Sequence, residues 1–284
     1  MQLGNHRRHH RHPLHPHHPV CASPRYLRVT VDLPTLLRNT AFMARGRDAS
    51  ADTTTVDPFR DSSGQALADY PHPVVAVDTA VLTVQPLTDG RSQLAVLQVR
   101  RSGSHRHGSW ALPGTFLHQG ERLIDAVHRS LQTKVGITGM TPTQLHVFDQ
   151  PDRDERGWVL SVAHLDAIPY PQLTGALHAR DDVRLAPASA PGPLPYDHTH
   201  ILTRAIEHLR ARYTTEPDPA HFLPTTFTLR DLRLLHEVIA GQPLQRDTFR
   251  RAMNPHLTPT GTPTTGGRGR PAELFRRRRR PRLR

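Results

Sequence analysis

The chain has 284 residues, which is long enough for two ordinary domains with some length to spare. Its formal net charge is +12, and it contains no apolar run approaching the roughly 18 residues of a membrane-spanning helix, which argues against a membrane protein. The basic N-terminus has no apolar stretch behind it to form a signal peptide, and the single cysteine, Cys21, cannot form an internal disulfide. We therefore expect a cytoplasmic protein.

Residues 1–72 show little periodic apolar pattern, and seven of the first eighteen residues are histidines. This composition predicts a disordered extension rich in His, Arg and Pro. Loose binding of Ni²⁺ or Zn²⁺ is an alternative, but the histidines have no acidic or cysteine partners at fixed spacing. We therefore expect no metal site there.

The next part of the chain, residues 73–213, mixes strand and helix patterns. Runs of β-branched and other apolar residues predict four strands, at residues 74–84, 94–99, 145–148 and 158–165. Apolar residues spaced by three and four predict helices at residues 120–135 and 198–213. The proline-rich run between residues 166 and 196 is expected to be irregular. Together these elements predict one α/β domain that ends near Tyr213.

A linker at residues 214–224 precedes a second unit at residues 225–276. Thr228 and Asp231 are spaced as a capping box, and the helix that they open stops at Gly241. A second helix, at about residues 245–253, ends before Pro255, with Phe249 and Met253 expected in the core. Two short helices joined by a tight glycine-containing turn predict a helix-turn-helix.

Positive charge is concentrated at the end of the chain. Residues 268–284 hold nine arginines and one acidic residue, Glu273, and so contribute +8 of the total. Such a local excess predicts a polyanion partner, nucleic acid first and an anionic membrane second. The Arg-rich tail, residues 277–284, has no frame with which to read a sequence, so nonspecific phosphate contact or a solvated tail are its two interpretations.

The stretch "WALPGTFLHQGERLIDAVHRSLQTKVGI", residues 110–137, resembles the Nudix box. The positions that keep the pattern are Glu121, Arg129, Leu131, Gly136 and Ile137. Thr115 replaces the first glycine, and the three acidic positions of the helix hold Ser130, Thr133 and Lys134. A strand, loop and helix with no ligand is the plainer interpretation, but the matching positions occur together at the right spacings.

The three acidic positions decide the chemistry. Positions i, i+3 and i+4 share one helix face, so three carboxylates there would converge on Mg²⁺ ions that hold a diphosphate and activate water. Here we expect that face to present two hydroxyls and the ammonium of Lys134, which would repel a divalent cation and could contact phosphate directly. The sequence therefore favours a pocket that binds a nucleotide without cutting it. Metal-dependent hydrolysis is the alternative, with Asp152, Asp154 or Glu155 as replacement ligands.

Further blocks extend the resemblance. The segments at residues 73–84, 151–165 and 196–202 look like those of ADP-ribose-type Nudix domains. Residues 227–253 and 266–276 resemble the winged helix of the Nudix-related transcriptional regulators of NAD metabolism. This resemblance implies an α/β Nudix-like sandwich, with a mixed sheet between helices, followed by a small winged helix-turn-helix domain. It also implies a homodimer that binds a double-stranded DNA operator and senses ADP-ribose or a related nucleotide. Some members of the family keep hydrolase activity.

Site residues follow from these assignments. The expected ligand contacts are Trp110, Gly114, Phe116, Glu121, Arg129 and Lys134, with no catalytic residue assigned although Glu121 is the one acidic box position kept. The expected DNA contacts are Arg246, Thr248, Arg250 and Arg251 on the second helix, and Arg268, Gly269 and Arg270 at the tip of the wing. A solvated basic face is the alternative for the helix. No cofactor is required, and Mg²⁺ would be needed only for hydrolysis.

Overall fold

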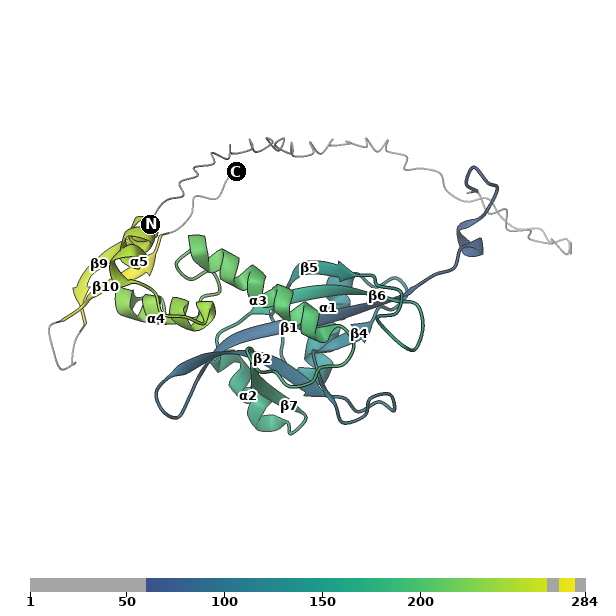
Figure 1. Ribbon diagram of the computed structural model, residues 1–284, viewed down its shortest axis with the longest axis horizontal. Coiled ribbons are helices and arrows are strands. Elements are labelled where there is room, and N and C mark those ends of the chain that lie inside the picture. Colours follow the sequence, from purple (N-terminus) through teal and green to yellow (C-terminus); the bar gives the residue numbers. More distant parts are fainter. Residues whose placement is uncertain (1–59, 265–270, 279–284) are drawn as a thin grey trace, which may run out of the picture. The chain divides into compact units, whose positions relative to one another are not determined.

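The computed structural model describes residues 60–264 and 271–278 (Figure 1). Its first sheet has seven strands: β1 Val74–Pro86, β2 Ser92–Arg100, β3 Trp110–Ala111, β4 Gly114–Phe116, β5 Thr143–Phe148, β6 Val159–Ala167 and β7 Val183–Pro187. The strand order is β3-β2-β1-β6-β5, with β4 paired to β1 and β7 paired to β2. Only the pairing of β1 with β6 is parallel, so the sheet is mixed as expected.

The central strand β1 is buried on both faces, and its side chains alternate between two cores. Val77 and Val81 belong to a cluster with residues of α1 (Leu123–Val135) and α2 (Pro171–Ala179). Ala80 and Leu82 belong to a cluster with residues of α3 (His198–Thr215). Because strand side chains alternate with a period of two, β1 separates helices on opposite faces of the sheet (Figure 1). The expected α/β sandwich is confirmed.

Helix α1 is the helix of the Nudix-box stretch, and its boundaries follow from its sequence. Its buried residues Ala126, Val127, Leu131 and Val135 recur at helical spacing and face the sheet. The helix ends at Gly136, whose φ of 82° lies in the left-handed region. Glycine adopts this conformation without the steric cost that a side chain would add. It starts at Leu123, three residues later than the pattern indicated.

The irregular run expected at residues 166–196 is partly wrong, because it contains both α2 and β7. Helix α2 has nine residues, and only Leu173 is buried in it, so the apolar periodicity that reveals longer helices is weak. Strand β7 pairs with β2 through five residues, ends at Pro187, and buries Val183 and Ala186, which are three residues apart and so show no alternation. Short elements with few buried side chains leave little signal in a sequence.

The second unit is the expected winged helix. It contains β8 (Phe227–Thr228), α4 (Leu229–Ala240), α5 (Arg246–Met253), the short 3₁₀ helix η2 (Asn254–His256), β9 (Leu257–Pro263) and β10 (Glu273–Arg277). Its three strands form a sheet in the order β8-β10-β9. The capping box is confirmed, since the amide of Asp231 donates to the Thr228 hydroxyl over 3.1 Å and the amide of Thr228 donates to the Asp231 carboxylate. Phe249 and Met253 are buried in the core, as expected.

The two ends of the described chain differ from the sequence-based boundaries. Residues 60–72 hold a turn and the 3₁₀ helix η1 (Leu67–Asp69), within the segment expected to be disordered. Arg277 belongs to β10 and not to the tail. The histidine-rich stretch, Cys21 and the wing-tip residues 268–270 lie outside the described residues. None of the described helices combines the length and apolar character needed to cross a lipid bilayer.

Candidate functional site

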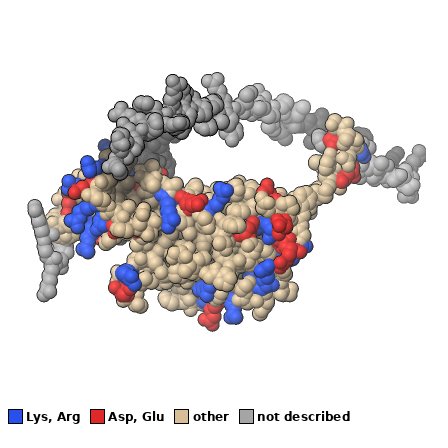
Figure 2. All heavy atoms as spheres, in the orientation of Figure 1, with Lys and Arg blue, Asp and Glu red and all other residues tan. Residues whose placement is uncertain are grey.

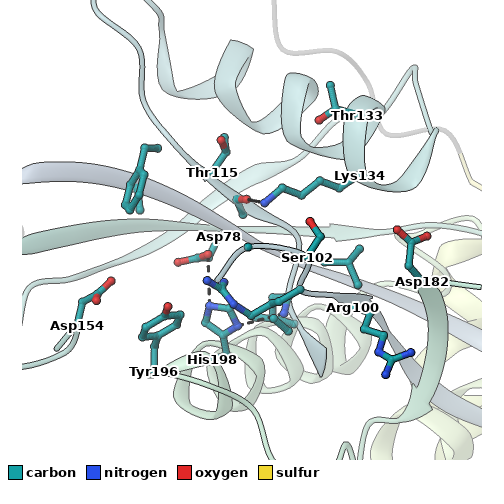
Figure 3. Close-up of a pocket in the computed structure, with 18 of the residues that line it drawn as sticks. Asp78, Arg100, Ser102, Thr115, Thr133, Lys134, Asp154, Asp182, Tyr196 and His198 are labelled. Carbon is teal, nitrogen blue, oxygen red and sulfur yellow. Dashed lines mark hydrogen bonds and ion pairs between the residues drawn. The ribbon is translucent and has the colours of Figure 1, made fainter. Parts of the chain in front are cut away.

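A pocket of about 380 Å³ opens where β1, β2 and the β3–β4 segment meet the last turn of α1 (Figure 3). This volume lies in the range of ordinary small-molecule sites. Its remaining walls come from the loop at residues 153–156, from Arg180 and Asp182 just before β7, and from residues just before and at the start of α3. Of the expected ligand contacts, Gly114, Phe116 and Lys134 line it.

Asp78 forms the floor of the pocket, and the sequence analysis did not single it out. It lies on the β1 face that looks toward α3, where the Nε2 of His198 is 3.4 Å from one carboxylate oxygen. The Ser161 hydroxyl donates to the other oxygen over 2.6 Å, and the Arg153 guanidinium lies 3.6 Å from it. Burial raises the pKa of Asp78, but its interactions with His198, Ser161 and Arg153 outweigh burial and lower the pKa to about 2. The floor is therefore a fixed, ionised carboxylate.

His198 is oriented by a backbone contact. The amide of Leu112 donates to its Nδ1 over 3.0 Å, so the hydrogen-bond network assigns the ring proton to Nε2, which faces Asp78. His198 is the first residue of α3. This contact joins the start of α3 to the floor of the pocket.

Gly114 lies against that floor, and its lack of a side chain is required. A Cβ at this position would lie 2.0 Å from an Asp78 carboxylate oxygen and 2.8 Å from the Val77 carbonyl oxygen. The Gly114 carbonyl accepts a hydrogen bond from the Lys134 ammonium. Because Gly114 has no side chain, its backbone lies close to both the Asp78 carboxylate and the Lys134 ammonium.

The three substituted box positions do not share one environment. Ser130 is 1% exposed and lies in the interior, which corrects the expectation that its hydroxyl would face the ligand. Thr133 lines the pocket, and its hydroxyl donates to the Arg129 carbonyl one turn earlier over 2.7 Å. Lys134 extends from α1 into the pocket above Asp78 (Figure 3). The altered face therefore presents one hydroxyl and one ammonium.

Glu121 and Arg129 form a structural clamp beside the pocket. The Arg129 guanidinium donates to both Glu121 oxygens over 2.8 Å and to the Phe116 carbonyl over 2.9 Å. The Arg129 bonds, joined by a hydrogen bond from the His118 amide, lower the pKa of Glu121 to about 2. Glu121, Arg129 and Trp110 lie outside the pocket lining, and Trp110 packs under the Arg184 guanidinium at 4.2 Å. Their role as ligand contacts stays a prediction.

Tyr196 was also missed, although it begins a segment that the resemblance included. Its ring lies 5.3 Å from the Arg101 guanidinium and 5.2 Å from that of Arg156, and all three residues line the pocket. Its φ of 55° is unusual for a side chain of this size, and strained backbone is often found at functional sites. Among the described residues its buried hydroxyl has no hydrogen-bond partner.

The donor set does not fit a divalent metal ion. Within residues 60–264 and 271–278, no group of three or more His, Cys, Asp or Glu is placed to hold one. Two of the proposed replacement ligands are already paired, Asp154 with Arg156 at 2.6 Å and Glu155 with Arg106 at 2.9 Å. The third, Asp152, is exposed and outside the pocket lining.

The second expected surface is helix α5. Arg246, Thr248, Arg250 and Arg251 are all exposed there, while Phe249 anchors the opposite side of the helix in the core. Figure 2 shows basic side chains over this part of the molecule. The helix therefore presents a basic face from a fixed frame.

Known proteins share both parts of this architecture. The NUDIX domain family matches residues 78–201, and the NrtR DNA-binding winged helix domain family matches residues 219–277. The ADPR responsive transcriptional repressor NtrR of Acinetobacter baylyi is 32% identical over 219 residues, which cover 74% of this chain and 84% of that protein. This chain belongs to the NrtR family.

Solved structures agree with membership of the NrtR family. NrtR of Shewanella oneidensis, complexed with a 27mer DNA, is 31% identical with a TM-score of 0.61, covering 72% of this chain and 93% of that one. A MutT/nudix family protein of Enterococcus faecalis is 25% identical with a TM-score of 0.59, covering 76% and 90%. An ADP-ribose pyrophosphatase of Methanocaldococcus jannaschii is 33% identical over 137 residues, which cover 47% of this NrtR-family chain and 73% of that enzyme.

Proposed function

We propose that this NrtR-family protein is a transcriptional repressor that binds operator DNA through its winged helix and senses ADP-ribose, or a related NAD-derived nucleotide, in its Nudix-like pocket. The observation that carries the proposal is the altered face of α1, where Lys134 lines the pocket at a position that would hold a metal-binding acid. The repressor of Acinetobacter baylyi is described as ADPR responsive, which supports the same ligand here. We also propose that the protein acts in the cytoplasm as a homodimer.

In this proposal the pocket recognises both parts of the nucleotide. Lys134 and Arg101 contact the diphosphate, since ammonium and guanidinium groups bind phosphate oxygens strongly. Phe116, which is exposed at the pocket edge, and Tyr196 offer ring faces to a base or a sugar. Trp110, Gly114, Glu121 and Arg129 remain proposed ligand contacts, and the Glu121–Arg129 pair also holds β4 to α1 through the Phe116 carbonyl.

The DNA contacts follow from the helix-turn-helix. The second helix of such a motif lies in the major groove with its early residues toward the base edges. Arg246, Thr248, Arg250 and Arg251 are exposed on α5 for that role. Arg268, Gly269 and Arg270 are proposed to enter the minor groove, where a narrow groove attracts arginine.

Helix α3 offers a physical route between pocket and DNA. Its first residue, His198, contacts the pocket floor, and near its other end Tyr213 packs edge-on against His236 of α4 with ring centroids 5.0 Å apart. The Arg210 guanidinium also donates to the Ile239 carbonyl of α4 over 2.9 Å. A ligand that shifts α3 would therefore act on the helix-turn-helix, and a coupling of about 1–3 kcal/mol is typical of such control.

Fluorescence anisotropy with labelled DNA from upstream of the protein's own gene tests this proposal. We expect sequence-preferring binding that changes about 5- to 150-fold when ADP-ribose is added. A scrambled duplex of the same length is the control for the DNA, and AMP is the control for the effector. Equal binding to both duplexes under every condition would contradict the proposal.

Hydrolysis of ADP-ribose is a second candidate, favoured by the retained Glu121 and by the likeness to an ADP-ribose pyrophosphatase. Such an activity would need Mg²⁺ or Mn²⁺ to hold the diphosphate. Release of AMP and ribose phosphate in the presence of either metal, abolished in Glu121→Gln, would establish it. No product above the Glu121→Gln background would reject it.

A further inference from the structure

We propose that Lys134 is a built-in cation that replaces a divalent metal ion, so that the pocket binds the nucleotide's diphosphate in its metal-free form. This inference rests on the proposed function and adds the chemical form in which the ligand is bound. Lys134 is the one lysine of the sequence, and its ammonium projects into the pocket from the last turn of α1 (Figure 3).

The exchange of an acid for lysine reverses the sign of the side-chain charge at this position. Where a carboxylate would need a bound divalent ion to attract a diphosphate, the ammonium of Lys134 is positive without a metal. The ammonium is held by the Gly114 carbonyl and lies in the field of Asp78. The charge that a metal would bring to the diphosphate is thus fixed to the chain.

The carboxylate of Glu121, the retained acidic position, is already engaged in hydrogen bonds within the protein. Both of its oxygens accept hydrogen bonds from Arg129 over 2.8 Å, and one also accepts from the His118 amide over 3.0 Å. A metal ion would have to break this bidentate pair before it could bind the carboxylate. Lys134 therefore faces no competing cation bound to Glu121.

The other charges around the pocket leave a surplus that suits a diphosphate. Each carboxylate in the lining has an arginine nearby: Asp154 pairs with Arg156, Asp182 with Arg180, and Asp78 shares Arg153 with Asp197, which lies outside the lining. The cations left over are Arg100, Arg101 and Lys134, whose described hydrogen bonds go to the backbone carbonyls of Gly108, His105 and Gly114. A carbonyl does not neutralise a cation, so this surplus is open to an anion.

The charges around Lys134 are consistent with the same conclusion. Desolvation lowers the pKa of Lys134, an effect that Asp78 opposes and that Arg101 and Arg129 increase. The residue is nevertheless exposed, so a phosphate oxygen can reach its ammonium.

Calorimetric titration of the full-length protein with ADP-ribose, in EDTA and in excess Mg²⁺, gives the first test. We expect the affinities in the two buffers to agree within about twofold, because no metal ion takes part in binding. Binding that requires Mg²⁺ would overturn the inference and leave the proposed function intact. Lack of binding in both buffers would overturn the two together.

Variants of Lys134 give the second test. In EDTA we expect Lys134→Met to weaken ADP-ribose binding about 10- to 100-fold, and Lys134→Arg to keep most of it. Lys134→Glu restores the acid of the box, so its binding should be weakest in EDTA and improve with Mg²⁺. Arg122→Met removes an exposed cation at the start of the same helix, 79% exposed, and is the matched control. Wild-type affinity of Lys134→Glu in EDTA would overturn the inference.

Chemical labelling separates ligand contact from a structural role of Lys134. Pyridoxal phosphate followed by borohydride reduction modifies amines, and Lys134 carries the one side-chain amine of the chain. We expect mass spectrometry to find the label on Lys134 and ADP-ribose to prevent it, while labelling of the N-terminal amine continues unchanged. Equal labelling of Lys134 with and without saturating ADP-ribose would overturn the inference, and thermal unfolding of each variant controls for folding.

Discussion

The pocket at the last turn of α1 and helix α5 are both basic, but only the pocket also contains buried ion pairs. In the pocket the side chain of Arg153 is 3% exposed and lies between Asp78 and Asp197, at 3.6 and 2.6 Å. On α5, Arg246 and Arg250 are exposed, and no ion pair with another described residue holds either of them. Buried, paired charges fix a shape in advance for a small ligand, whereas solvated arginines can adjust to a long polyanion and release its counterions.

A substitution at the junction of these two regions should have the largest effect. Asp218 follows α3, and its fully buried carboxylate accepts hydrogen bonds from the Tyr213 hydroxyl at 2.6 Å and the Leu223 amide at 2.9 Å. It also pairs with Arg277 at the end of β10. Asp218→Ala leaves a largely buried guanidinium unpaired, so we expect the free energy of unfolding to fall by about 3–5 kcal/mol.

Urea denaturation of the full-length protein measures that loss. Asp152→Ala removes an exposed acid and should change the free energy of unfolding by less than about 0.5 kcal/mol. A loss below about 1 kcal/mol for Asp218→Ala would mean that this pair behaves like a surface ion pair. The winged helix would then be held by its apolar core alone.

The exposed arginines of α5 should show a smaller and more selective effect. Arg250→Ala removes a side chain able to form paired hydrogen bonds with guanine, so we expect operator affinity to fall by about 1–3 kcal/mol. Because Arg250 lies outside the pocket lining, ADP-ribose affinity should not change. Anisotropy titration over a salt series measures the first quantity and calorimetry the second.

An arginine on the other domain is the control for this effect. Arg122→Ala removes an exposed guanidinium at the start of α1, and we expect operator binding to keep its wild-type value. An equal loss of DNA affinity in both variants would assign the effect to overall charge and not to the helix-turn-helix. Helix α5 and the pocket would then differ in the amount of positive charge and not in how they recognise DNA.

Local patterns predicted the elements whose burial is periodic. Strands β1, β2 and β6 and helices α1, α3, α4 and α5 each bury several apolar side chains at the spacing of their own geometry. The caps at Thr228 and Gly241 have short-range causes, a side chain that meets an amide three residues away and a backbone in the left-handed region. Such features depend only on residues that are close together in the chain, so they can be predicted from the sequence.

The pocket could be predicted only in part. Gly114, Phe116 and Lys134 belong to one continuous motif, and the resemblance located them. Arg101 and Tyr196 come from separate loops that meet only in the folded chain, and no local pattern indicates that meeting. Ser130 lies four residues after Ala126 and three after Val127, on the apolar stripe of α1, so helical spacing was the signal that could have placed its hydroxyl inward.

The clamp between Glu121 and Arg129 should give the smallest effect, visible mainly as a pH dependence. The pKa of Glu121 is lowered to about 2, chiefly by the hydrogen bonds of Arg129, from an ordinary value of 4.5. A carboxyl whose pKa is lower in the folded state contributes stability that is present above pH 4.5 and is lost as the pH falls toward 2. We therefore expect Glu121→Gln to flatten the decline of the thermal midpoint across this window and to reduce the midpoint slightly at neutral pH. Arg129→Met should flatten it in the same way, because it removes the other half of the clamp, whereas parallel profiles for wild type and Glu121→Gln would show that the clamp does not link protons to folding.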